Sequence, residues 1–246
     1  MGSQIPTSSI DWGNVAQWAG AIATFFAVLV ALFKEVVLRR RRRAKLSARI
    51  MLSPPDSIKE IWRYRHPSQS PIKETTRYMF RLWVSNQGNY HRVEKVQVFA
   101  AKLDKLSADR KTFVPVKEFL PMNLVWSNTR TPTNPDGEKF LEGISPHSMG
   151  KHCDLGHITN PVALVDLEEE QHTDVPVGRT VLVLELEFRP FTKTYLLPPG
   201  TYRLELIIAG VNALPVPKTL EITITGDWYE DPEIMFRDGV RIKILD

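Results

Sequence analysis

TYRLELIIA, residues 201–209, alternates polar and apolar side chains over its first six residues and ends in three apolar ones. Tyr202, Leu204, Leu206 and Ile208 would share one face of an extended strand, with the intervening residues on the other face. A helix would scatter these four residues around its axis. The stretch therefore predicts a β-strand with one face in a core.

The same period of two recurs on both sides of this stretch. It is found in YMFRLWVSN (78–86), VEKVQVFAAKL (93–103), RTVLVLELEF (179–188), KTLEITIT (218–225) and VRIKIL (240–245). The segment 93–103 follows 78–86 at the distance of a β-hairpin, with Val96, Val98 and Ala100 on one face. Repeated strands between Pro/Gly turns predict a mainly β chain, folded as an antiparallel β-sandwich over residues 50–246.

The acidic residues of these strands are expected on their solvent faces. In 179–188, Leu182, Leu184, Leu186 and Phe188 form the apolar side, which places the glutamates between them outside. The glutamates assigned to solvent are Glu185, Glu187, Glu205 and Glu221. Residues 104–178 carry many turn formers and few clean strands, and long irregular connections of this kind are often functional.

Residues 12–38 predict a transmembrane helix. From Trp12 to Phe33 there is no charged residue, and these 22 residues would span about 33 Å as a helix, close to a hydrocarbon core. A secretion signal would place its positive charges before the apolar run, whereas here they follow it. Trp12 and Trp18 suit the outer headgroup boundary.

A basic juxtamembrane segment, residues 39–49, follows the apolar run. Eight basic residues and one acid lie between Lys34 and Arg49, so the chain's net charge of +4 is the sum of +7 here and −3 elsewhere. Such charges stay cytoplasmic and contact anionic lipids, and their confinement to one segment argues against a nucleic-acid-binding domain. The residues assigned to lipid contact and topology are Arg39, Arg40, Arg41, Arg42, Arg43 and Lys45.

This arrangement predicts a single-pass protein of the inner (plasma) membrane. Residues 1–11 would lie outside and residues 50–246 in the cytosol, in agreement with the single cysteine, Cys153. The small residues of the apolar run are spaced by three or four and form a seam along which two helices can approach closely. The seam consists of Ala16, Gly20, Ala23, Ala27 and Ala31. It predicts homo-oligomerisation through this face of the helix.

Four further segments carry a resemblance: PMNLVWSNT (121–129), HCDLGHI (152–158), LPPGTYRLEL (197–206) and GDWYEDPEIMFRDGVRIKI (226–244). In this order, behind one N-terminal span, they resemble a group of uncharacterised prokaryotic membrane proteins. The resemblance implies a single-pass protein with a C-terminal immunoglobulin-like sandwich, and it implies no activity. LPPGTYRLEL alone is similar to the turn that opens a late strand in many immunoglobulin-like folds.

The histidines offer one chemical hypothesis. His147, His152, Cys153 and His157 are candidate zinc ligands, with Asp154 between them and His172 farther on. The spacings match no established zinc motif, and in the alternative interpretation Cys153, Leu155 and Ile158 enter a strand as core residues. No phosphate-binding loop, nucleophile elbow, dinucleotide fingerprint or H-E-x-x-H motif is present, so no cofactor is expected.

Three functions remain open from the sequence. The first is a non-enzymatic, membrane-anchored module that binds a protein or a small ligand. The second is an oligomerising membrane effector with a cytosolic sensor domain, and the third is a metal-dependent hydrolase built on the histidines.

Overall fold

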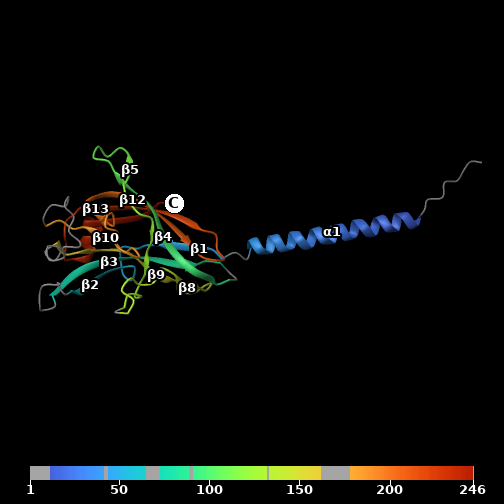
Figure 1. Ribbon diagram of the computed structural model, residues 1–246, viewed down its shortest axis with the longest axis horizontal. Coiled ribbons are helices and arrows are strands. Elements are labelled where there is room, and N and C mark those ends of the chain that lie inside the picture. Colours follow the sequence, from blue (N-terminus) through green and yellow to red (C-terminus); the bar gives the residue numbers. More distant parts are fainter. Residues whose placement is uncertain are drawn as a thin grey trace, which may run out of the picture. The chain divides into compact units, whose positions relative to one another are not determined.

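A computed structural model of the chain describes residues 12–41, 44–64, 73–88, 91–131, 133–161 and 178–245. The apolar segment forms one uninterrupted helix, α1 (Trp12–Arg41) (Figure 1). Its part from Gln17 to Lys34 has a mean hydropathy of 1.6 and is long and apolar enough to cross a membrane. Every side chain described in α1, at residues 17–34, is exposed.

The rest of the chain, Ala44–Asp246, is a separate compact unit, called here the β-domain. Among its described residues the strands form two antiparallel sheets. The first sheet contains β1 (Leu46–Arg49), β2 (Ser57–Tyr64), β3 (Lys73–Asn86), β7 (Val125–Trp126), β9 (Lys151–Thr159), β10 (Leu182–Leu184) and β11 (Leu196–Leu197). The second contains β4 (Val93–Leu106), β5 (Phe113–Pro115), β6 (Met122–Asn123), β8 (Leu141–Ile144), β12 (Gly200–Ala209), β13 (Val216–Ile224) and β14 (Val240–Leu245).

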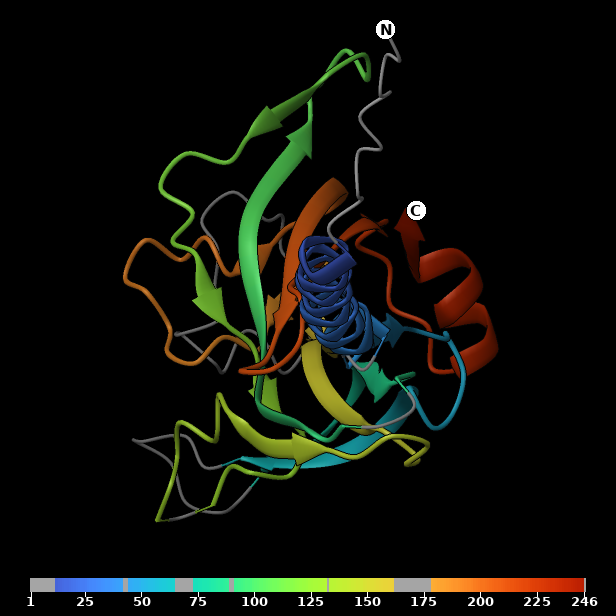
Figure 2. The same ribbon diagram turned by 90° about the vertical axis from the view of Figure 1, so that its right-hand side faces the viewer.

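Each sheet has a long central pair of strands. In the first, β3 pairs with β9, and β1 and β2 both pair with the other edge of β3. In the second, β12 lies between β4 and β13, and β14 closes the far edge (Figure 2). Short helical turns, α3 (Pro232–Ile234) and η2 (Met235–Gly239), connect β13 to β14, and Phe236 from η2 packs against Tyr78 and Phe80 of β3.

The two sheets share one hydrophobic core. Tyr202, Leu204, Leu206 and Ile208 of β12 are buried, and the residues between them are more exposed, which confirms the predicted alternation. Val96, Val98 and Ala100 of β4 are buried as well. Each fully buried Leu, Ile or Val contributes about 1.5–3 kcal/mol relative to an exposed one, so this alternation is the main stabilising feature of the domain.

The predicted hairpin between 78–86 and 93–103 is wrong, because β3 and β4 lie in different sheets. Asn86, at the end of β3, organises the crossover. Its side-chain amide donates to the carbonyls of His91 (2.8 Å) and Ile144 (3.2 Å), and its oxygen accepts from Gly88 N (2.9 Å). The buried side chain of Asn86 therefore links the end of β3 to His91 and Ile144, where the predicted hairpin would have had a tight turn.

The predicted domain boundary at residue 50 also moves. The β-domain begins at Ala44, because β1 takes Leu46–Arg49 into the first sheet. Lys45, assigned to the juxtamembrane segment, donates its backbone N–H to the Asn86 side chain (3.3 Å). Ala44 itself bridges to Ala213, in the connection between β12 and β13.

Candidate functional site

β9 lies within the segment that appeared irregular in sequence, and it carries most of the chemically interesting side chains. Its register against β3 shifts at Leu155: Phe80 is opposite Gly156, whereas Arg81 is opposite Asp154. This bulge puts His157 on the same outer face as His152 and Asp154, while Cys153 and Ile158 face the core. Without the extra residue, strict alternation would have placed His157 in the core.

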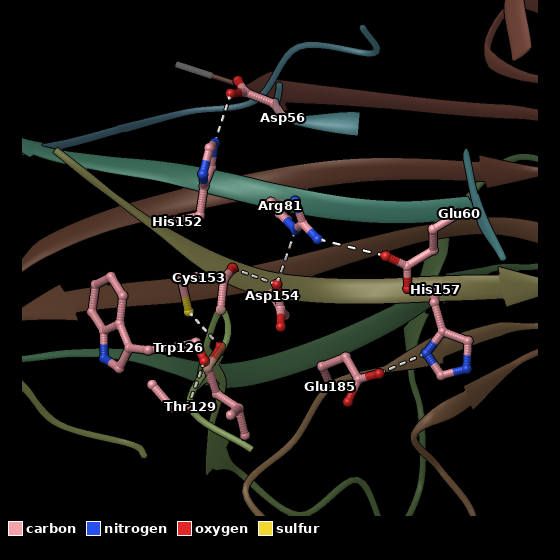
Figure 3. A network of polar contacts seen from close by, with 12 residues as sticks. Asp56, Glu60, Arg81, Trp126, Thr129, His152, Cys153, Asp154, His157 and Glu185 are labelled. Carbon is pink, nitrogen blue, oxygen red and sulfur yellow. Dashed lines mark hydrogen bonds and ion pairs between the residues drawn. The ribbon is translucent and has the colours of Figure 1, made fainter. Parts of the chain in front are cut away.

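The outer face of β9 holds an ion triple of His157, Glu185 and Arg130, in which the histidine and the glutamate are buried and the side chain of the arginine is 37% exposed. His157 Nδ1 donates to Glu185 Oε1 (2.6 Å) (Figure 3). Arg130 forms an ion pair with the other carboxylate oxygen of Glu185. Burial alone would raise the pKa of the Glu185 carboxyl. The hydrogen bond from His157 and the charges of His157 and Arg130 outweigh it and lower the pKa to about 2. Glu185 is therefore an anion in the folded protein.

The assignment of Glu185 to a solvent face is wrong, since the residue is only 4% exposed. The regular strand ends at Leu184, and Val125 N then donates to the carbonyl of Glu185 (3.1 Å). Phe188, expected on the core side, is 54% exposed for the same reason. Glu187, Glu205 and Glu221 are all more exposed than Glu185, as predicted for strand positions facing solvent.

A second ionic group continues along the same face. Arg81 lies between Asp154 (3.4 Å) and Glu60 (3.9 Å) (Figure 3). Arg77 also donates to Glu60 (2.5 Å). Ser127 donates its hydroxyl to Asp154. Burial and the charge of Glu185 raise the pKa of Asp154, whereas the bond from Ser127 and the charges of Arg81 and Arg130 lower it, and the net shift is upward.

The candidate zinc ligands do not come together. His147 lies in an exposed turn, His152 contacts Asp56 (3.2 Å), and His157 contacts Glu185. Cys153 faces the core, where its thiol donates to the carbonyl of Val125 (3.4 Å). His172 lies outside the described residues. Within the described part of the chain, no group of three His, Cys, Asp or Glu side chains could hold a metal ion.

The contacts of Ser127 and Cys153 beside β9 hold segments of the β-domain together and do not form a nucleophile–base pair. Ser127 donates to a carboxylate and the Cys153 thiol to a backbone carbonyl, so neither is hydrogen-bonded to a histidine as an activated nucleophile would be. Burial raises the pKa of Cys153 well above its ordinary value, which keeps the thiol protonated and unreactive. Leu155 and Ile158 are fully buried, as the core interpretation of this strand predicts.

A pocket of about 660 Å³ opens elsewhere on the β-domain. Its floor is apolar and includes Leu103 of β4, Leu196 and Leu197 of β11, and Tyr202 of β12. The polar side chains that line it are Lys105, Arg179, Thr192, Lys193 and Thr194. Because four separate segments build this pocket, no single stretch of sequence signals it.

Arg179 is held in position at the rim of the pocket. Its guanidinium donates to Asp227 (2.6 Å) and to the carbonyl of Thr225 (2.6 Å). Between these two residues lies Gly226, with φ of +88°, where a Cβ would come within 2.8 Å of the Arg179 side chain. Glycine is therefore required here both by the backbone conformation and by the approach of the arginine.

The residues assigned to the membrane are only partly described. Trp18, Gly20, Ala23, Ala27, Ala31 and Phe33 lie in α1 and are exposed, and the space around Gly20 is open. Trp12, Arg39, Arg40 and Arg41 belong to α1 by their backbone alone, and Arg42 and Arg43 lie outside the described residues. Lipid contact and association through the small-residue seam stay predictions.

Comparison of the chain with protein-family models, with curated proteins and with solved structures gives no match.

Proposed function

We propose that the protein is a membrane-anchored binding module, in which α1 spans the membrane and the β-domain binds a small ligand in the cytosol without catalysing a reaction. The pocket at Arg179 and Tyr202 carries this proposal. Its volume lies within the range of about 300–1,000 Å³ typical of small-molecule sites, and its apolar floor with a few polar side chains is the usual composition of such sites.

The strand pairing supports an immunoglobulin-like sandwich as the scaffold of the pocket. In that fold, the first, second and fifth strands share one sheet, and the third, sixth and seventh share the other. β1, β3 and β9 pair in this way in one sheet, and β4, β12 and β13 in the other. One departure is β10, which follows β9 in the chain and occupies the place next to it in the sheet.

Tyr202 adds a second argument for this scaffold. It stands at the start of β12 and is buried, and its hydroxyl donates to the carbonyl of Pro198 (2.9 Å). Immunoglobulin-like folds carry such a tyrosine corner where the corresponding strand begins. Within the motif LPPGTYRLEL, the tyrosine hydroxyl therefore ties the start of β12 to the turn before it. The same tyrosine forms part of the pocket wall.

The composition of α1 supports an inner-membrane anchor with the β-domain in the cytosol. The apolar part of the helix is followed directly by Arg39–Arg43, and basic residues beside a span stay on the cytoplasmic side. Protease protection with a tag at each terminus tests this orientation. The C-terminal tag should be cleaved only after the cells are permeabilised, and cleavage in intact cells would reverse the proposed orientation.

Ligand binding is tested on the full chain in phosphatidylcholine nanodiscs, with a set of neutral, cationic and anionic small molecules. Binding is read by ligand-observed NMR and repeated with Thr194→Trp, which places an indole in the pocket from a half-buried lining position. Thr133→Trp, at an exposed threonine outside the pocket, is the control. Ligands should bind the control and not Thr194→Trp. If no member of the set distinguishes the two variants, the pocket is not a binding site.

A further inference from the structure

The turn that connects β12 to β13, residues 210–215 and called here the β12–β13 turn, exposes apolar side chains. Val211 and Leu214 are 70% and 58% exposed, and the only polar side chain in the turn is that of Asn212. Surface turns are usually rich in polar residues that water can hydrate. The apolar side chains of this turn lack the burial that would stabilise them.

The backbone of the β12–β13 turn is bonded to the start of β4. The side-chain amide of Asn212 donates to the carbonyl of Arg92 (2.7 Å), and its oxygen accepts from Glu94 N (3.4 Å). Val211 N donates to the carbonyl of Glu94 (2.9 Å). The one polar side chain of the turn is therefore engaged with the protein, and the side chains left facing outward are the apolar ones.

The position of this turn in the fold distinguishes it from others. Exposed apolar side chains also occur elsewhere in the β-domain, as at Phe191, which is 93% exposed. In the β12–β13 turn, however, Ala213 pairs with Ala44, the first residue of the β-domain. α1 ends at Arg41, and only two residues lie between it and Ala44. The turn is therefore bonded to the point where the chain enters the β-domain from α1.

The length of the intervening chain limits how far the turn can lie from a membrane that α1 crosses. From Lys34, where the apolar window ends, to Arg41 the helix rises about 10 Å. The chain from there to Ala44 adds at most about 11 Å. The headgroups occupy about 5–7 Å on each side of a hydrocarbon core. A tilt of the helix shortens the remaining distance, so a lipid surface lies within reach of the turn.

Met149 adds an exposed apolar side chain at the same end of the first sheet. It is 83% exposed and lies in the turn before β9. β9 begins opposite the end of β3, where Lys151 pairs with Val84, and β1 begins at the same end, where Leu46 pairs with Asn86. The end of the β-domain that follows the anchor therefore carries apolar side chains from two separate turns.

We propose that the β12–β13 turn inserts the side chains of Val211 and Leu214 into the membrane leaflet beside the β-domain, which is the cytoplasmic leaflet in the proposed orientation. The inference goes beyond ligand binding and rests on one part of the proposed function, the membrane anchor. Apolar side chains of interfacial segments are buried about 5–10 Å deep at the boundary of headgroups and acyl chains. Because α1 already holds the chain at the membrane, this second contact is intramolecular, and two side chains suffice where a free soluble domain would bind weakly.

Fluorescence of a label at Leu214, on the full chain in phosphatidylcholine nanodiscs, tests this contact. Leu214→Cys is labelled with the environment-sensitive dye NBD, and the nanodiscs are prepared with and without lipids that carry a nitroxide on the acyl chain. Emission from this label should shift to shorter wavelength on reconstitution and should be quenched by the nitroxide lipids. Wild type gives the background labelling, since its single cysteine, Cys153, is buried.

Val114→Cys is the matched control. Val114 is also aliphatic and is 51% exposed, and it pairs with Lys105 near the end of β4. Glu94, which bonds to the β12–β13 turn, stands at the start of the same strand, about 35 Å away along its axis. A label at residue 114 should show neither the shift nor the quenching. Quenching at 214 that does not exceed quenching at 114 would overturn the proposal.

Two substitutions test the part played by the apolar side chains. Val211→Asp, in the chain labelled at 214, places a carboxylate in the inserted turn and should abolish most of the quenching, because a charge is costly at that depth. Val114→Asp, in the same labelled chain, should leave the quenching unchanged. Equal effects of the two substitutions would contradict insertion. A label at 214 that shifts to shorter wavelength without quenching would indicate burial against protein, such as a second copy of this chain, and would also overturn the proposal.

Carbonate extraction of membranes separates a failure of this inference from a failure of the proposed function. Release of the chain by carbonate would refute the anchor, and the inference would fall with it. Retention of the chain with an unquenched label at 214 would refute the contact of the turn alone. Ligand binding in the pocket is measured independently with Thr194→Trp, whatever the result at the turn.

Discussion

Replacing Glu185 by glutamine tests whether the ion triple of His157, Glu185 and Arg130 stabilises the fold. Glu185→Gln keeps the size of the side chain and removes its charge, so that His157 and Arg130 lose their shared carboxylate. His157 is buried, so water does not replace its lost partner, whereas Arg130 is 37% exposed and can be hydrated. We expect a large loss of stability from this change of a few atoms.

The pKa of Glu185 gives the size of the loss. At about 1.4 kcal/mol for each pH unit, lowering the pKa from its ordinary 4.5 to about 2 corresponds to about 3 kcal/mol of folding free energy. A carboxyl whose pKa falls on folding stabilises the protein fully above its unfolded pKa. This contribution is therefore present at neutral pH and is lost as the pH falls from about 4.5 towards 2.

Urea unfolding of the full chain in detergent micelles, followed by tryptophan fluorescence, measures this difference between wild type and variant. Trp126 is a suitable reporter because it is buried in the core. At pH 7 the variant should be about 3 kcal/mol less stable, which leaves it folded if the domain has the stability of about 5–15 kcal/mol common to globular proteins. Below about pH 4.5 the two free energies should converge.

Glu187→Gln is the matched control, two residues along the chain. Glu187 is more exposed and pairs with Lys139, and such pairs near the surface contribute about 0–1 kcal/mol. A loss below 1 kcal/mol for Glu185→Gln at neutral pH, or a loss that stays constant down to pH 3, would show that the ion triple does not stabilise the fold in this way.

Three further predictions concern the core and the pocket. Tyr202→Phe leaves the carbonyl of Pro198 without its hydrogen bond and should cost about 1–2 kcal/mol in urea unfolding, and an unchanged midpoint would exclude a stabilising corner. Cys153 should resist iodoacetamide in the native protein and react in urea, as read by mass spectrometry, because burial keeps its thiol protonated; native labelling would contradict the buried position. Gly226→Ala should destabilise the domain by at least about 1 kcal/mol in urea unfolding, because the positive φ disfavours a side chain and the new Cβ would lie 2.5 Å from Pro199 and 2.8 Å from Arg179; a wild-type midpoint would refute the role of the glycine.

The strands with one buried and one exposed face were predictable from the sequence. β12, β13 and β14 follow the predicted segments closely, because each alternates apolar and polar residues over most of its length. The pairing of β3 was not predictable in the same way. Its distance from β4 along the chain suits a hairpin, and only the contacts of Asn86 with residues of other segments show why the chain crosses to the second sheet.

The candidate site was harder to predict, because its partners are distant in the sequence. Glu185 continues the alternating pattern of its strand, and no local signal reveals Arg130, 55 residues earlier, or His157, 28 residues earlier. β9 was anticipated only in the alternative interpretation of Cys153, Leu155 and Ile158, because the bulge at Leu155 interrupts the alternation of core and outer residues along the strand. The pocket is distributed in a similar way, since residues 192–202 line it together with Leu103, Lys105, Val116 and Arg179 from distant parts of the chain.

The first residues of the β-domain have a mechanical consequence. Ala44 bridges to Ala213 beside the second sheet, and directly after it Lys45 and Leu46 bond to the end of β3 in the first sheet. Tension on the chain at this point is therefore shared by both sheets from the first residue onward. An edge strand attached to one sheet alone could be peeled away bond by bond. Here a load on residue 44 must break contacts to both sheets together, and the pocket, with Tyr202 near the start of β12, lies at the opposite end of that strand from Ala213.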